Sequence, residues 1–521
     1  MRDGHATAGY KQQSKSEQFS VLSFRFSAQN LKPKTQNCSM VKHVIRVIRG
    51  SSFFMKSIQI RRDGIRTCNT NETSRAVGET SEVASRLPEA LRALRHRNFQ
   101  LFFAGQLVSL TGTWMQSVAQ SWLVYRLTGS AVLLGSVGFA SQIPVFLLAA
   151  FGGAIADRRA KHRILILTQT FSMLLATTLA ALTLSGRIQV WHVFVIAALL
   201  GIVNAFDIPT RQAFTVEMVG KSDLMNAIAL NSSMFNAARI VGPAVAGILV
   251  ATIGEGWCFA ANAASYTAVI SGLLMMHVAP RVKLFAKGSA LSGIREGFRF
   301  VAMTAPVRAL LLLLGLVSLM GMPYAVLMPI FAREILGGGA SSLGMLMGAS
   351  GVGALAGAVT LAMRGRGRGV RGLGRWVASA SAGFGASIIL FAMSRSFWLS
   401  AVLLVPAGFS MMVQMASSNT LVQAMVPDAL RGRVMAVYSM MFMGMAPFGA
   451  LLAGTIATHL GAPTTVIIGG VACIVGAGVF RLRLPALRVE ARRILVSLEM
   501  TGGHPAEAVT GEGTVVTSRQ T

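Results

Sequence analysis

The segment Leu107-Val-Ser-Leu-Thr-Gly112 recurs 209 positions further on as Leu316-Val-Ser-Leu-Met-Gly321. At the same offset Gly129, Ala131, Leu134, Gly135, Ala140 and Ser141 match Gly338, Ala340, Leu343, Gly344, Ala349 and Ser350. At an offset of 207, Met218, Val219, Ala229, Ser232, Gly242, Ala246, Gly247 and Gly254 match Met425, Val426, Ala436, Ser439, Gly449, Ala453, Gly454 and Gly461. A register held this far along the chain indicates two related halves.

The repeated segments lie within or beside long apolar runs. A helix needs about 20 mostly apolar residues to cross a bilayer. We place twelve such runs at 98–125, 131–155, 162–185, 190–208, 226–253, 257–279, 306–335, 341–363, 374–394, 397–424, 434–459 and 463–483. The sequence therefore predicts an all-α polytopic membrane protein with twelve transmembrane helices, six in each half. Two halves of this kind bind a substrate between them near the membrane midplane.

The composition supports the membrane class. Of the 521 residues, 53% are hydrophobic and only 13% are charged, whereas soluble proteins carry about 25% charged residues. The 54 glycines fit as well, because small residues let membrane helices approach closely. The four cysteines have neither metal-site nor disulfide spacing, and we expect no metal and no cofactor.

The formal charge of +29 favours a nucleic-acid partner only if the basic residues form a patch on a folded domain. Instead they lie in the tails and in alternate loops, so we expect no nucleic-acid partner. One set of loops holds Arg158, Arg159, Lys161, Arg163, Arg211, Lys221, Arg281, Lys283, Lys287, Arg295, Arg299, Arg364, Arg366, Arg368, Arg371, Arg375, Arg431 and Arg433. The other set holds Arg126, Arg187, Arg333 and Arg395. The positive-inside rule makes the first set cytoplasmic, together with both termini.

The domain boundaries follow from these runs. We expect a disordered basic extension at 1–86, six-helix halves at 95–280 and 306–484, a cytoplasmic central loop at 281–305, and a disordered cytoplasmic tail at 485–521. The extension has the Arg-rich, Ser-rich composition of a transit peptide. It could equally come from a start codon placed too far upstream, which we favour because Met40 and Met55 offer later starts.

The loop after the second run carries a recognisable motif, Gly153-Ala-Ile-Ala-Asp157-Arg158-Arg-Ala-Lys161-His-Arg163. Residues 95–484 resemble the major facilitator superfamily, whose signature loop has Gly, Asp, Arg, a second Gly and several basic residues. Here Ala160 replaces the second glycine. We expect Gly153 to permit close helix packing and Asp157 to act as a gating latch, with Arg211 as its speculative partner. The alternative is an ordinary basic loop.

The fifth run contains Arg239-Ile-Val-Gly242-Pro243-Ala-Val-Ala-Gly247. It is similar to the Gly-Pro motif that antiporters of this superfamily carry in their fifth span. Pro243 removes a backbone hydrogen bond and the glycines admit a partner helix, so a kink here could seal one side of the pore. The resemblance favours export over import.

Arg239 is expected near the membrane midplane, facing the cavity. A charge at that depth requires a polar or anionic partner, and the two candidates are Asp207 and an anionic group of the substrate. A hydrogen bond to helix carbonyl groups is the structural alternative.

Two further segments, from Pro209-Thr-Arg211-Gln-Ala-Phe214 and from Val426-Pro-Asp-Ala-Leu-Arg-Gly-Arg433, are similar to cytoplasmic loops of the bacterial branch that includes siderophore exporters. The resemblance implies a multi-pass protein of the bacterial inner membrane. Polar residues inside the runs are candidates for the substrate cavity: Gln106, Gln116, Gln120, Asn204, Asp207, Asn236, Gln414 and Asn419. Each amide could instead join two helices.

The leading hypothesis is a monomeric secondary exporter of a small organic molecule, a drug-like compound or a siderophore, driven by inward proton flow. The proton drive is what the resemblance implies, and no carboxylate lies at the centre of a predicted span. The alternatives are an importer of the same fold and a membrane-embedded sensor or enzyme. An enzyme is disfavoured because the sequence contains no HExxH motif, no acidic cluster and no nucleophile beside a base.

Overall fold

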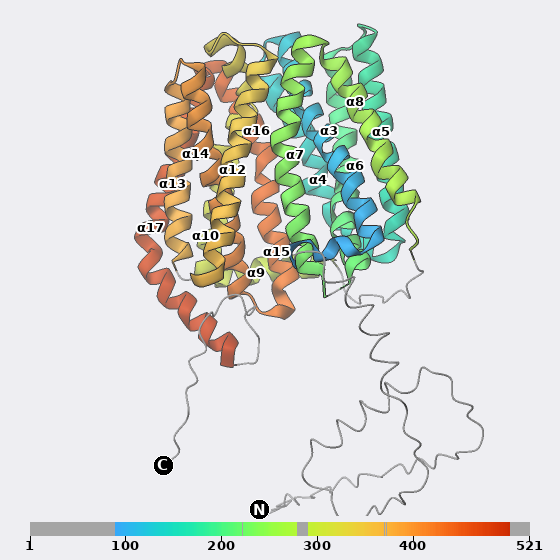
Figure 1. The fold of residues 1–521 in the computed structure, drawn as a ribbon. Helices are drawn as coiled ribbons and strands as arrows, with labels where there is room; N and C mark the ends of the chain where they lie inside the picture. The colour runs from blue at the N-terminus through green and yellow to red at the C-terminus, as the bar shows by residue number, and fades with distance from the viewer. Residues whose placement is uncertain (1–88, 221, 279–289, 369, 371, 501–521) are drawn as a thin grey trace, which may run out of the picture. The chain divides into compact units, whose positions relative to one another are not determined.

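The structure is a computed structural model that describes residues 89–220, 222–278, 290–368, 370 and 372–500. The extension predicted at 1–86 and residues 501–521 of the predicted tail lie outside the described residues. Within the described ranges every regular element is a helix (Figure 1). The first helices are η2 (Glu89–Arg95), α3 (Arg97–Thr128), α4 (Ala131–Arg158), α5 (Lys161–Leu184), α6 (Val190–Val219), α7 (Leu224–Thr252) and α8 (Glu255–Leu274).

After α9 (Ala290–Met303) come α10 (Ala305–Leu316), η3 (Val317–Gly321), η4 (Met322–Ala325), α11 (Met328–Ile330) and η5 (Phe331–Ile335). The chain ends in α12 (Ala340–Arg368), α13 (Leu373–Met393), α14 (Phe397–Met425), α15 (Asp428–Met443), α16 (Met445–Leu460) and α17 (Ala462–Met500). Among the described residues, 11 helical segments are long and apolar enough to cross a membrane. Helix α3 is not one of them, because its glutamines lower its hydropathy.

The helices pack as two sets. In the first set (α3 to α8), α3 and α5 pack on α8, while α4 packs on α6. In the second set (α10 to α17), α14 packs on α12 and α13, while α13 packs on α17. The sets meet chiefly where α7 contacts α12 and where α4 contacts α16.

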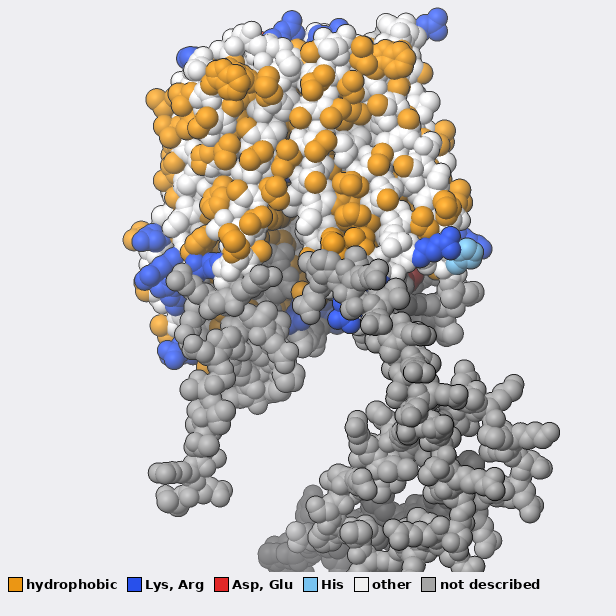
Figure 2. Space-filling model, viewed as in Figure 1, with side chains coloured by type: hydrophobic (Ala, Val, Ile, Leu, Met, Phe, Trp, Pro, Cys, Tyr) orange, Lys and Arg blue, Asp and Glu red, His pale blue; other side chains and the backbone are white. Residues whose placement is uncertain are grey.

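Apolar side chains cover the band between the two ends of the bundle, and Lys and Arg side chains gather at the ends (Figure 2). We call the end at which α3 begins and α4 ends the basic end, and the opposite end the far end. This distribution is typical of a protein whose middle lies in lipid.

Helix α6 is longer than the sequence predicted. The fourth run was expected to end at 208, with Pro209 and Arg211 in the loop after it, but α6 continues to Val219. Pro209 lacks a backbone N–H, so the Ala205 carbonyl oxygen one turn earlier loses its helical hydrogen bond. Membrane helices tolerate a proline inside a span more often than soluble helices do.

Part of the predicted disordered tail is helical. Helix α17 runs through Pro485 to Met500, so residues 485–500 are helical rather than part of a disordered segment. Arg488, Arg492 and Arg493 lower the hydropathy of this extension, so it does not continue the apolar run that ends at 483.

The span at 305–335 is irregular, which the sequence analysis did not predict. A π-helical turn (η3) and a 3-10 turn (η4) interrupt it, and two further short turns complete it. Pro323 and Pro329 fall inside this stretch, where each removes a helical hydrogen bond. The repeated segment is therefore straight helix in α3 but distorted helix in the second set.

The predicted central loop contains a helix, α9. Its Gly297 lies so near α15 that an added Cβ atom would come within 2.7 Å of the Arg433 carbonyl oxygen. Glu296 forms an ion pair with Arg433 at the same contact. Residues 290–303 of the connection between the sets are thus helical and pack on the second set.

Candidate functional site

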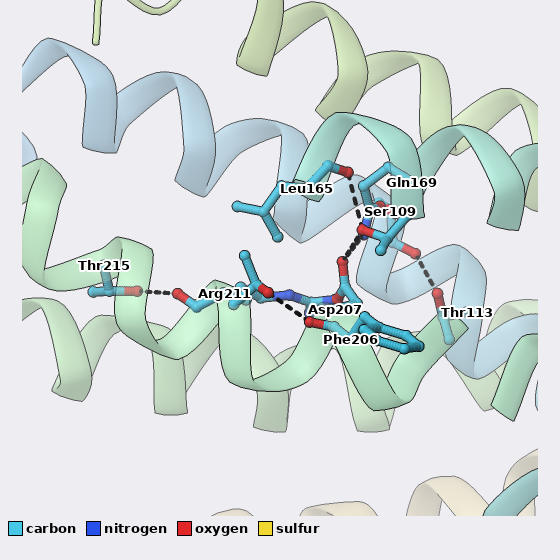
Figure 3. A network of polar contacts seen from close by, with 10 residues as sticks. Ser109, Thr113, Leu165, Gln169, Phe206, Asp207, Arg211 and Thr215 are labelled. Carbon is cyan, nitrogen blue, oxygen red and sulfur yellow. Dashed lines mark hydrogen bonds and ion pairs between the residues drawn. The ribbon is translucent and has the colours of Figure 1, made fainter. Parts of the chain in front are cut away.

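A buried carboxylate, Asp207, is the centre of a polar network between α5 and α6 (Figure 3). The Thr168 hydroxyl group and the Gln169 amide each donate to Asp207 Oδ1 at 2.8 Å. Arg211, one turn further along α6, forms an ion pair with Asp207 Oδ2. The Asp207 residue is only 1% exposed, so these neighbours replace the water that a carboxylate needs.

Close helix packing holds this network in place. A Cβ atom added at Gly152 of α4 would overlap the Ala205 carbonyl oxygen of α6, so only glycine fits there. The same view shows Ser109 and Thr113 of α3, where the Thr113 hydroxyl group donates to the Ser109 carbonyl oxygen at 3.0 Å (Figure 3). The ion pair therefore sits inside the first set, several helical turns from either end of α6.

The structure tests one of two predicted pairings. The pairing of Arg211 with Asp157 stays a prediction, because the side chain of Asp157 lies outside the described residues. The other pairing is wrong: Asp207 was one candidate partner of Arg239. The structure instead joins Asp207 to Arg211 within α6. The reason is the length of α6: because the helix continues past 208, positions 207 and 211 lie on the same face, four residues apart.

The motif at 153–163 has a different packing glycine from the one predicted. A Cβ atom at Gly153 would meet only the Pro209 side chain, at 4.0 Å, whereas Gly152 makes the close approach. Lys161 forms an ion pair with Glu217 at 2.9 Å, which ties α5 to the end of α6. Arg158 and Arg163 are exposed. The side chain of Asp157 lies outside the described residues, so its latch role stays a prediction.

The motif in α7 faces two neighbours. A Cβ atom at Gly242 would come within 2.5 Å of the Trp114 side chain of α3, in the same set. Gly247 lies against Ser341 of α12, and the Pro243 carbonyl oxygen faces Gly344 of the same helix. Within the motif, Gly242 therefore packs α7 on the first set, and Gly247 packs it on the second set.

Arg239 lies in the middle of α7 and is partly exposed. Its Cζ atom is 5.9 Å from the centre of the Trp114 ring, within the range of a cation–π interaction. Among the residues whose side chains the structure describes, no carboxylate lies within ion-pair distance of this guanidinium. A charge at the bilayer centre costs at least about 2.5–3.5 kcal/mol on insertion scales, so Arg239 is an expensive residue to keep there.

The other candidate amide side chains differ in their hydrogen-bond partners and in their burial. Gln116 accepts a hydrogen bond from Asn262 of α8 at 2.6 Å, and Asn236 donates to the Ser232 carbonyl oxygen of its own helix. Asn419 pairs with Gln423 within α14. Gln120 and Asn204 are partly exposed. Gln106 and Gln414 are buried, and each leaves one side-chain atom without a partner among the described residues.

Several residues of the network were not predicted. The buried polar residues of the first set also include Thr168, Gln169, Asn262 and Tyr266. Tyr266 lies beside Thr113, Asn262 and Ser172. Consecutive polar residues in the third run, at 168 and 169, and the asparagine in the sixth run were the available signals.

The far end carries a contact between the sets that the sequence did not reveal. The Tyr125 hydroxyl group at the end of α3 donates to the Glu334 carboxylate of η5. The adjacent Arg126 pairs with Glu255 of α8 at 2.7 Å, within the first set. One turn of α3 thus contacts both sets.

A second buried carboxylate, Asp223, lies before α7 at the basic end. Arg92 Nε (3.2 Å), Arg95 Nη2 (2.7 Å) and His96 Nε2 (2.7 Å) converge on it from η2 and the start of α3. The hydrogen bond from His96 and the two arginines hold the pKa of Asp223 below its usual value. This cluster fastens the first described turn of the chain to the loop between α6 and α7.

The fold and its buried polar network define a membrane transporter of the major facilitator type. Residues 89–516 match the family of transmembrane secretion effectors. Because that match spans most of the sequence, the chain belongs to this family. It is a multi-pass protein of the bacterial inner membrane, and its relatives are transporters rather than enzymes.

Three characterised relatives illustrate the family. The staphyloferrin A transporter of Staphylococcus aureus is 26% identical over 72% of this chain and 93% of its own length. The multidrug efflux pump Tap of Mycolicibacterium fortuitum is 27% identical over 74% of this chain and 96% of its own. The enterobactin exporter of Shigella boydii is 24% identical over 76% of this chain and 93% of its own.

Solved structures share the fold. A point mutant of the nucleoside transporter NupG superimposes with a TM-score of 0.57 at 15% identity, over 74% of this chain and 99% of its own. A bacterial homologue of the iron transporter ferroportin, in an inward-facing state, gives a TM-score of 0.56 at 16% identity, over 74% and 98%. These likenesses concern the fold alone.

Proposed function

We propose that this protein is a proton-coupled exporter of a small organic molecule that works by alternating access. The relatives that export drugs or a siderophore support the direction and the kind of substrate. The proposed topology has twelve spans, with α3 as the first, in two halves at 95–280 and 306–484 joined by the 281–305 segment. Both termini are cytoplasmic in it, so the basic end faces the cytoplasm, and the protein acts as a monomer.

The observation that carries the proton coupling is the Asp207–Arg211 pair. Among the residues whose side chains the structure describes, Asp207 is the one carboxylate that lies buried deep within a span. A proton arriving from outside forms an O–H bond on Asp207 and removes its charge, which releases Arg211 from the ion pair. The same proton leaves to the cytoplasm when the pair forms again, so each cycle carries one proton inward.

The two sets differ at this position, which supports one-sided coupling. The residue 207 positions after Asp207 is Gln414, and the residue equivalent to Arg211 is Ser418. Both are buried, but neither side chain is a carboxylic acid. We therefore assign proton exchange to the first set and a passive role to the equivalent place in the second set.

The state of the structure is one that the proposed alternating-access cycle contains. Glycine contacts join the sets in the half of the bundle toward the far end, where α7 meets α12 and α4 meets α16. With the basic end at the cytoplasm, this is an outward-closed arrangement, in which an exporter receives its cargo. The motif at 153–163, with Asp157 as its latch, would close the cytoplasmic side in the opposite state.

Inside-out membrane vesicles test the proposal. An acid interior should drive accumulation of fluorescent drug-like compounds by the wild type, and Asp207→Asn should lower this driven uptake by at least about tenfold, because the neutral amide cannot release a proton. Exchange of labelled for unlabelled compound without a gradient should survive. Glu490→Gln, in the extension of α17, is the matched control. Driven uptake by Asp207→Asn at the wild-type rate would remove Asp207 from the coupling step, and accumulation only in right-side-out vesicles would favour the importer.

A further inference from the structure

The guanidinium of Arg239 takes no part in the proposed coupling step. It lies half-way along α7, where α7 borders the second set: a Cβ atom at Gly351 of α12 would come within 3.2 Å of the Arg239 carbonyl oxygen. The Tyr324 hydroxyl group of η4, which shares a 3.0 Å hydrogen bond with Ser350, lies within electrostatic range of the guanidinium. Arg239 therefore sits between the two sets near mid-depth, where transporters of this architecture hold their substrates.

The charge of Arg239 is not balanced by the protein side chains that the structure describes. Asp207, the side chain that the sequence offered as a partner, is held by Thr168, Gln169 and Arg211 instead. The one described contact of the guanidinium is the face of Trp114, which stabilises a cation without neutralising it. A charged residue at this depth usually has an anionic or polar partner, and no carboxylate lies within ion-pair distance of Arg239 among the residues whose side chains the structure describes.

Aromatic side chains lie beside the guanidinium. Trp114 contacts Phe235 edge to face, with ring centroids 5.6 Å apart and an interplanar angle of 77°. Tyr324 approaches from the second set. A planar cation with five N–H donors binds a carboxylate through two parallel hydrogen bonds, and the aromatic rings favour a flat apolar body attached to that carboxylate.

We propose that Arg239 and Trp114 form the substrate site for organic anions in which a carboxylate is joined to an aromatic group. The proposal rests on the proposed export function and names its substrate class. The substrate carboxylate supplies the missing counter-charge of Arg239, and its ring packs against Trp114 and Phe235. The same unpaired cation repels positively charged compounds, so lipophilic cations are excluded from this site.

Binding to purified protein in lipid nanodiscs tests the proposal without any transport step. Equilibrium dialysis would compare radiolabelled 1-naphthoate with the neutral 1-naphthamide and the cation 1-naphthylmethylammonium, which share one ring system. We expect the wild type to bind the carboxylate at least about tenfold more tightly than the amide and to bind the cation least. Arg239→Gln should lose this preference, so that its affinity for the carboxylate falls to that for the amide.

Two further variants separate charge from shape. Arg239→Lys keeps the charge but not the planar fork, so it should retain part of the preference. Trp114→Leu should weaken the carboxylate and the amide equally. Arg187→Gln, an exposed arginine at the far end, is the matched control and should bind as the wild type does.

Equal affinities of the wild type for the carboxylate and the amide would overturn the proposal, and so would an unchanged preference in folded Arg239→Gln. The wild-type comparison needs no variant, so misfolding of a mutant leaves the test intact. Because binding requires no gradient, an export failure with selective binding would refute the proposed function alone, whereas driven export without selective binding would refute this inference alone.

Discussion

Gly344 of α12 lies directly against Pro243 of α7: a Cβ atom at Gly344 would overlap the Pro243 carbonyl oxygen. The repeat-related contact is the same, because a Cβ atom at Gly135 of α4 would overlap the Ala450 carbonyl oxygen of α16. Gly344 follows Gly135 by 209 positions, and Ala450 follows Pro243 by 207. Two equivalent glycine contacts therefore join the two sets.

Substitution of this glycine should prevent the sets from closing. In Gly344→Ala the methyl group would meet backbone atoms, which cannot rotate away, so the outward-closed state should be lost and transport should fall at least about tenfold. Efflux and the chemical accessibility of a cysteine placed at the far end would measure the change. Gly348→Ala, one turn further along α12, is the control, because its methyl group would meet only the Ile240 carbonyl oxygen at 3.8 Å. Equal transport by both variants would contradict the tight contact.

The pair Lys161–Glu217 should behave as a coupled unit. Its side chains are 18% and 21% exposed, with Nζ and Oε1 2.9 Å apart, so Lys161→Glu or Glu217→Lys alone places like charges together. Each should lower the stability of the purified protein, and the double exchange should restore most of the loss, with a coupling energy of about 0.5–1 kcal/mol. A thermal-unfolding double-mutant cycle measures it. Additive effects would mean that the two side chains do not interact in solution.

The anchor at Asp223 should weaken in acid. Because the pKa of Asp223 is lowered in the folded protein by His96, Arg95 and Arg92, its ionised form stabilises the folded state above the unfolded pKa of about 3.9. That stabilisation is lost as the pH falls through the lower folded value. Hydrogen exchange of residues 89–97, corrected for intrinsic rates, should therefore rise below about pH 4.

Asp223→Asn is the matching variant for this experiment. It should show the rapid exchange of residues 89–97 already at neutral pH, with little further change in acid, because the titrating carboxylate is gone. Protection of this segment in the Asn variant equal to that of the wild type would show that the arginines hold η2 through other contacts.

The Tyr125–Glu334 hydrogen bond should help to keep the far end closed. Tyr125→Phe removes the donor while preserving the ring, and it should shift the population toward the open far end by a factor of about 2 to 10, the effect of one net hydrogen bond. Spin-label distances between the far ends of α3 and α12 would report the shift. Tyr438→Phe, which loses a bond to the Met415 carbonyl oxygen inside the second set, should leave these distances unchanged.

Reporter fusions test the proposed topology. Fusions in the 281–305 segment should score cytoplasmic, whereas fusions at Gly186 and Ser396 should score external, because basic loops resist translocation. An external score for the central segment would contradict the cytoplasmic placement of the basic end.

The sequence by itself determined the class of this protein and the equivalence of its repeats. Hydropathy indicated helices of membrane-spanning length, and the spacing of repeated glycines such as Gly135 and Gly344 marked related segments, because these properties depend on local composition and on register. It also indicated that Arg239 needs a counter-charge, since the cost of burying a charge does not depend on which neighbour is present.

Only the tertiary structure decided the partners. Whether Asp207 pairs with Arg211 or Arg239 depends on where α6 ends and which face of it meets α5, and the sequence did not show that α6 continues past Pro209. In the same way, only the packing of α4 on α6 distinguished Gly152 from Gly153. A hydrogen bond or ion pair requires atoms within about 3 Å, and residues far apart in the sequence acquire that proximity only when the helices pack.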